Sequence, residues 1–136
     1  MFTYTRKARY HETDQMGIIH HSNYVKWMEE ARIEYMDSVG LGYRAMEEEG
    51  IASPVVGITV DYKKAVRFDD LVEVRVSVSR YTGASIELHY EFFNATAGYV
   101  CTLATSRHAF VKGDRLVSLK RLKPELHARL LEEISA

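Results

Sequence analysis

The residues of this sequence best suited to chemistry lie in one segment, from Tyr10 to Arg32, whose first half is rich in acidic and histidine side chains. Asp14 stands in a stretch without apolar periodicity, and His21 follows it seven residues later. A carboxylate in such a loop could attack a carbonyl carbon or remove a proton from water. Gly17, between the two, lets the backbone turn tightly or approach a ligand closely.

A helix is expected to begin just after His21, with Ser22 as a favourable N-cap residue. Behind it, apolar side chains recur at helical spacing, at Tyr24, Trp27, Met28, Ala31 and Tyr35. A helix start carries backbone N–H groups without intrahelical partners and the positive end of the helix dipole. Such a site could stabilise the charge on an attacked carbonyl oxygen, worth about 3–4 kcal/mol per donor.

The rest of the chain predicts a sheet that positions this segment. Apolar and polar side chains alternate in four segments, as in strands with one face on a core and one in water; these are Phe2–Tyr10, Val56–Tyr62, Val72–Val78 and Ile86–Phe92. Tight turns are expected at three places, Thr82-Gly83, Asn94–Gly98 and Gly113-Asp114. Residues 99–111 are apolar on both faces in places, which is typical of a central or interface strand.

Glycine and proline set the expected helix bounds. The long helix should end at Gly40, a short helix should run from Leu41 to Glu49, and a terminal helix should begin at Pro124. The resulting order is a strand, a long apolar helix, a meander of strands and a last helix. We therefore expect an α+β hotdog fold, in which an antiparallel β-sheet wraps around one long central α-helix.

Composition narrows the function classes. The chain has 136 residues without a Pro/Gly/Ser linker, so a single domain over 1–136 is expected. With 18 basic and 19 acidic residues, it shows no charge excess for nucleic acid or a membrane surface. Cys101 is the one cysteine and should be a buried apolar residue. The start of the chain lacks the apolar core of a signal peptide, so a cytoplasmic location is expected.

The segment resembles the 4-hydroxybenzoyl-CoA thioesterase family of acyl-CoA hydrolases. The matching pattern is a loop Asp, then Gly-Ile-Ile-His, Asn-Tyr, an aromatic residue, an acidic residue and Ala-Arg, here Asp14, Gly17–His20, Asn23, Tyr24, Trp27, Glu29, Ala31 and Arg32. A shorter match is Arg67-Phe68-Asp69-Asp70. The resemblance implies a hotdog thioesterase over nearly the whole chain, forming homodimers or homotetramers with the site at the dimer interface.

The resemblance also implies roles for single residues. The Asp matching Asp14 is the nucleophile or general base, and the N–H of the residue matching His21 polarises the thioester carbonyl. In one bacterial subgroup, residues matching Tyr10 and His21 accompany that Asp, and this chain has both. It lacks the Pro and the aromatic residue that the aryl-CoA hydrolases have where Gln15 and His21 stand, which favours a small or aliphatic acyl group.

Structural roles remain open for each of these residues. Asp14 could merely cap a turn, His21 could make only a local hydrogen bond, and Tyr10 could be a core residue with a hydrogen-bonded tip. Lys64 and Arg67 could attract the phosphates of coenzyme A or contact only solvent, and Gly17 and Ile18 could line the substrate site. A metal site at His20-His21 is disfavoured because no third ligand stands at a standard spacing.

Two other functions compete with thioester hydrolysis. One is hydration or dehydration of an enoyl-CoA on the same fold, and the other is acyl-CoA binding without turnover. In the leading hypothesis, coenzyme A enters as part of the substrate, and neither a metal nor a tightly held cofactor is needed.

Overall fold

The structure is a computed structural model that describes residues 1–40 and 42–135. Of Ser135 it describes the backbone only. A five-stranded antiparallel sheet has the strand order β1-β4-β5-β6-β3. Its strands are β1 (Phe2–Lys7), β3 (Val55–Tyr62), β4 (Leu71–Tyr81), β5 (Ser85–Asn94) and β6 (Tyr99–Ala109). A small second sheet joins β2 (Ile51–Ala52), β7 (Val111–Lys112) and β8 (Arg115–Leu116).

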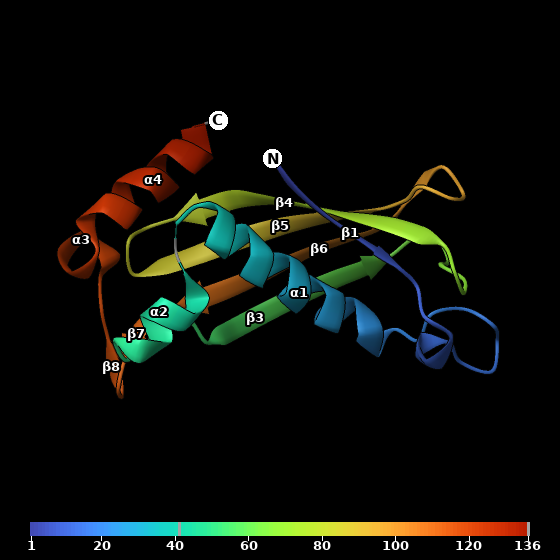
Figure 1. Cartoon of the computed structure of the whole chain (residues 1–136), viewed down its shortest axis with the longest axis horizontal. Coiled ribbons are helices and arrows are strands. Elements are labelled where there is room, and N and C mark those ends of the chain that lie inside the picture. Colours follow the sequence, from blue (N-terminus) through green and yellow to red (C-terminus); the bar gives the residue numbers. More distant parts are fainter. Residues whose placement is uncertain (41, 136) are drawn as a thin grey trace.

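Helices flank the large sheet (Figure 1). The long helix α1 (Ser22–Ser38) lies across the sheet. Helix α4 (Pro124–Ser135) packs against β4, at the upper left of the picture. The shorter helices are the 3-10 helix η1 (Tyr10–Glu12), α2 (Tyr43–Glu48) and α3 (Leu119–Leu122). This mixture of an antiparallel sheet and helices confirms the predicted α+β class. In the described part of the chain, no helix has both the length and the apolar character to cross a bilayer.

Side-chain periodicity predicted the core well. The alternating apolar positions of β4 and β5, from Val72 to Val78 and from Ile86 to Phe92, are buried. So is the apolar stripe of α1, including Trp27, and Cys101 is buried as expected. The turns predicted at Thr82-Gly83, Asn94–Gly98 and Gly113-Asp114 all lie where two strands are joined. Gly40 follows α1 with a φ of 86°, a conformation that glycine adopts without strain.

The first strand is shorter than the alternation predicted. It ends at Lys7, because the backbone of the next residue, Ala8, bonds to Asp69 and Asp70 instead. The Ala8 N–H donates to Asp70 O and the Asp69 N–H donates to Ala8 O, both at 2.9 Å. The prediction that Tyr10 closes the apolar face of this strand is wrong. Tyr10 instead opens η1 with 76% of its side chain exposed.

The apolar face expected for the second strand is not buried within the chain. Strand β3 forms as predicted, but Val56 is 56% exposed and Ile58 is 39% exposed. The reason is topological: β3 is the edge strand beyond β6, whereas α1 packs against β4 and β1. An edge strand with an apolar face offers both backbone and side chains to another chain.

Hydrogen-bonded polar groups on β6 reach the segment before β3. The His108 ring, 1% exposed, has Nε2 2.7 Å from Ser106 Oγ and Nδ1 3.2 Å from Ser53 O. A carbonyl can only accept, so the proton of the neutral ring is on Nδ1 and Nε2 accepts from Ser106. Burial, and secondarily the positive charge of Arg32, lowers the pKa of His108 to about 4.

This shift predicts how stability depends on pH. In the unfolded chain the pKa of His108 returns to about 6.5, so between pH 6.5 and 4 the unfolded state binds the extra proton. The contribution of neutral His108 to the unfolding free energy is complete above that pH range. About 3 kcal/mol of it is lost as the pH falls through the range. Urea unfolding at pH 7, 5.5 and 4.5 should show this loss in the wild type but not in His108→Gln. Parallel pH dependence in the two proteins would contradict the assignment, and His89→Gln is the control.

Candidate active site

Asp14 lies at the turn of a closed loop between η1 and α1. Its N–H donates to Ile18 O at 2.9 Å, its carbonyl accepts from Gly17 N–H at 3.0 Å, and its Oδ1 accepts from Met16 N–H at 2.8 Å. Gly17 has a φ of 78°, which favours glycine there. Asp14 therefore does cap a turn, but with one oxygen only. Its Oδ2 has no hydrogen-bond partner among the described residues.

The loop is held against the segment before β4. Ile18 forms a β-bridge with Arg67, and the N–H of Ile19 donates to Val66 O at 2.8 Å. The Arg67 N–H in turn donates to Asp70 Oδ2 at 2.9 Å. The Arg-Phe-Asp-Asp patch therefore supports the Asp14 loop through its backbone.

Glu12 anchors the loop from the buried side. Its carboxylate accepts from Trp27 Nε1 and Arg6 Nη2, each at 2.9 Å, and from the Arg9 N–H at 2.8 Å. Its carbonyl accepts from the His20 N–H at 2.8 Å. No role was predicted for Glu12 from the sequence. The available signal was Trp27, since an indole N–H on a buried stripe needs an acceptor.

The start of α1 leaves one amide open. Ser22 N–H donates to His20 Nδ1 at 3.2 Å, and Asn23 N–H donates to His20 O at 3.0 Å. Tyr24 N–H donates to His21 O at 3.3 Å. Within the residues that the structure describes, the His21 N–H meets no acceptor. The expectation that Ser22 is the N-cap is wrong by one residue: His21 occupies that position, and the Ser22 hydroxyl pairs with His20.

A groove of about 340 Å³ brings the Asp14 loop, the helix start and the end of β3 together. It is lined by Asp14, Met16, Ile18, Ile19, His21, Tyr24, Tyr62, Lys63, Lys64 and Ala65. The structure thus places four of the predicted site residues on one surface, namely Asp14, Ile18, His21 and Lys64. The Tyr62 hydroxyl donates to His21 O at 2.9 Å, and burial raises the pKa of Tyr62, which keeps it a neutral donor.

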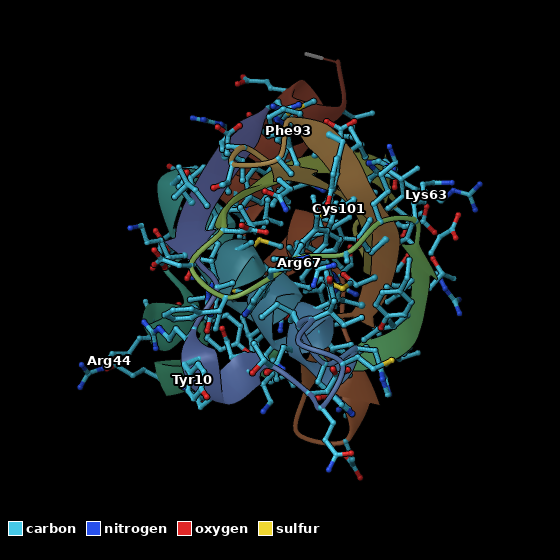
Figure 2. The ribbon with its side chains drawn as sticks, turned by 90° about the vertical axis from the view of Figure 1, so that its right-hand side faces the viewer. Tyr10, Arg44, Lys63, Arg67, Phe93 and Cys101 are labelled. Atoms are coloured by element: carbon cyan, nitrogen blue, oxygen red, sulfur yellow. The ribbon has the colours of Figure 1, made fainter. Side chains whose placement is uncertain are left out.

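The other predicted site residues lie around this groove rather than in its lining. Gly17 shapes the turn behind Asp14, and Arg67 supports the loop through the bridge to Ile18. The Tyr10 ring meets the Phe68 ring edge-on, with centroids 5.5 Å apart, and Tyr10 lies on the opposite side of this end of the molecule from Lys63 (Figure 2). The structure therefore does not bring Tyr10 to the groove.

Two lysines stand along the groove. The ammonium of Lys64 lies 4.9 Å from the centre of the Tyr99 ring, and Lys63 pairs with Asp61 at 3.1 Å. Across the described residues, no group of three histidine, cysteine or carboxylate side chains is placed to hold one metal ion. The residues that line the groove thus include one with an unpaired carboxylate oxygen, one with an open backbone amide and two lysines. That combination suits attack on a carbonyl carbon.

Known proteins share both the sequence and the fold. Residues 8–132 match the family model of the thioesterase-like superfamily. YneP of Bacillus subtilis, whose name assigns it provisionally to the acyl-CoA thioesterases, is 35% identical over 123 residues, covering 89% of this chain and 88% of YneP. A DHNA-CoA thioesterase structure from Staphylococcus aureus superposes with a TM-score of 0.91 at 35% identity, covering 96% of this chain and 88% of that one.

The fold and the match define a class of hotdog-type thioester hydrolases. This chain belongs to the thioesterase-like superfamily. The resemblance drawn from the Asp14 motif is thereby confirmed, and so is the expectation of a thioester hydrolase at the level of the enzyme class.

Proposed function

We propose that this protein hydrolyses acyl-CoA thioesters to a free acid and coenzyme A. Asp14 acts as nucleophile or general base, and the His21 N–H binds the carbonyl oxygen as it becomes negative. The observation that supports this proposal most is that one groove is lined by both residues, of which Asp14 has a carboxylate oxygen and His21 a backbone N–H without a hydrogen-bond partner among the described residues. Relatives named as acyl-CoA thioesterases support the same substrate class.

Coenzyme A enters in this proposal only as part of the substrate. Lys63, Lys64 and Arg67 supply positive charge near the groove for its phosphates. Ile18 and Tyr24 give the groove apolar walls for the acyl group, and we favour a small or aliphatic one. We also propose that α1 is the central helix of a hotdog domain. The protein is proposed to act in the cytoplasm.

A thiol-release screen tests this function. Aliphatic acyl-CoAs of increasing length are compared with an aromatic ester such as 1,4-dihydroxy-2-naphthoyl-CoA, for which some relatives are named. Faster release from an aliphatic ester would support our substrate preference, and faster release from the aromatic ester would overturn it. Crotonyl-CoA belongs in the screen, because loss of its enoyl absorbance without free thiol would indicate hydration instead. No thiol from any ester would refute hydrolysis.

We expect the active form to be a homodimer, paired through the open edge at β3. Ile58→Lys places a charge on this apolar edge and should shift the protein towards monomers with reduced hydrolysis. Sedimentation velocity at micromolar concentration measures the shift. Ile134→Lys on α4 is the matched control, because both isoleucines are 39% exposed. A monomeric and fully active wild type would contradict this prediction, as would an unchanged dimer in Ile58→Lys.

A further inference from the structure

We propose that His20 is a positioning residue for the reaction: its neutral ring accepts the first amide of α1, and among the described residues the His21 N–H is then the one open donor at the helix start. This inference rests on the proposed function, because the open donor is the one assigned to the thioester oxygen. The family resemblance implies no role for His20, and from the sequence alone a metal site was the one role weighed for it, and disfavoured.

Two hydrogen bonds fix the state of the His20 ring. Nδ1 lies 3.2 Å from the Ser22 nitrogen and 2.8 Å from Ser22 Oγ. A backbone N–H can only donate, so Nδ1 must carry a lone pair and the proton of the neutral ring must lie on Nε2. The ring of His20, the residue before the N-cap, thus accepts the first amide of α1, one of the N–H groups that lack an intrahelical partner.

The same ring also steadies the open amide. The His20 and His21 rings lie side by side, with centroids 4.1 Å apart and planes inclined by 30°. The His21 and Tyr62 rings are nearly perpendicular, with centroids 6.4 Å apart, and the Tyr62 hydroxyl donates to the His21 carbonyl. The peptide groups on both sides of His21 are therefore restrained, and its N–H has one fixed direction. A preorganised donor of this kind needs no reorganisation as charge develops.

Protonation of His20 would undo this arrangement. A proton on Nδ1 removes the acceptor of the Ser22 N–H and places a cation at the positive end of the helix dipole. Several charged groups share with His20 a polar hollow of about 400 Å³ on the other side of the Asp14 loop. They come from β1, η1, the loop and α1, namely Arg6, Arg9, His11, Glu12, Asp14, Lys26 and Glu30, and His21 is stacked on the ring itself. Because carboxylates and cations both line the hollow that His20 shares, the test compares variants rather than reading one pH midpoint.

Kinetics of two His20 variants test the role. His20→Ala should lower kcat by about 10–100-fold with little change in KM, because a misdirected donor affects the transition state more than binding. His20→Asn should recover most of the rate, since its amide oxygen can accept the same N–H two residues ahead. His89→Asn is the control on the sheet.

A second readout does not need turnover. Histidine ¹⁵N shifts in the unliganded protein should show Nδ1 of neutral His20 without a proton, and His20→Ala should shift the Ser22 and His21 amide signals. A proton on Nδ1 would overturn the inference, as would equal kcat in His20→Ala and the wild type. If the wild type hydrolyses no ester, the proposed function fails and the catalytic role of His20 fails with it. The ring shifts then still report whether the His20 ring accepts the Ser22 N–H.

Discussion

Replacing Asp14 by asparagine is expected to lower kcat for thioester hydrolysis by about 10²–10⁴-fold while KM changes little. The amide oxygen can keep the 2.8 Å bond from the Met16 N–H, so the turn should survive. The variant loses only the negative charge and the free Oδ2 that would attack or deprotonate water. Steady-state thiol release on the best ester of the screen measures the effect.

Two further variants make the Asp14 result specific. Asp14→Ala also removes the turn bond and should be no more active than the asparagine form. Asp114→Asn, in the turn between β7 and β8, changes the same functional group away from the groove and should match the wild type. Hydrolysis by Asp14→Asn at the wild-type rate would show that another group does the chemistry.

Removing the Glu12 side chain is expected to cost about 3–5 kcal/mol of unfolding free energy. The carboxylate is buried, and its loss leaves Trp27 Nε1 and the Arg9 N–H without an acceptor and Arg6 without one of its two carboxylate partners. Arg6 would still pair with Glu30 at 2.6 Å, so the protein should fold at reduced stability rather than fail to fold. Urea unfolding of Glu12→Ala at pH 7 measures the loss.

The same variant should also slow hydrolysis, because the Glu12 backbone and side chain join the Asp14 loop to α1. Glu12→Gln keeps an oxygen for the indole N–H and should lose less stability than the alanine form. Glu48→Ala, in an exposed pair with Arg44, should change the unfolding free energy by less than about 1 kcal/mol. An unchanged urea midpoint in Glu12→Ala would show that the buried carboxylate does not hold the loop.

Periodicity and turn residues predicted most of the elements because burial alternates with the pleat of a strand and the turn of a helix. The expected strand at residues 56–62 formed, but its alternation could not show whether this chain or another one covers the apolar face. The end of β1 was missed for a related reason. The bonds from Ala8 to Asp69 and Asp70 join residues about 60 positions apart, which no local pattern records.

The candidate site was predicted in part. Asp14, Ile18, His21 and Lys64 do line one groove, although only the resemblance gave them roles. Tyr10 was placed with them from its spacing in the motif, but its side chain points towards Phe68 instead. Glu12 and the hydrogen bonds of the His20 ring were missed, because hydrogen bonding to a distant indole or to a neighbouring amide depends on where the loop turns. Leu41, the predicted first residue of the short helix, lies outside the described residues.

The loop that carries Asp14 and the side chain of Met16 on the same loop are held in different ways. Glu12 and the backbone of Ile18 and Ile19 are fixed by hydrogen bonds to other parts of the chain, and the backbone of residues 14–17 is fixed by bonds within the loop. Met16, in contrast, extends a largely exposed side chain. Substitutions at Met16 should therefore reshape the pocket without moving the carboxylate or the open amide. A protein built in this way can acquire a new acyl preference through substitutions at Met16, while the Asp14 carboxylate and the His21 amide keep their positions.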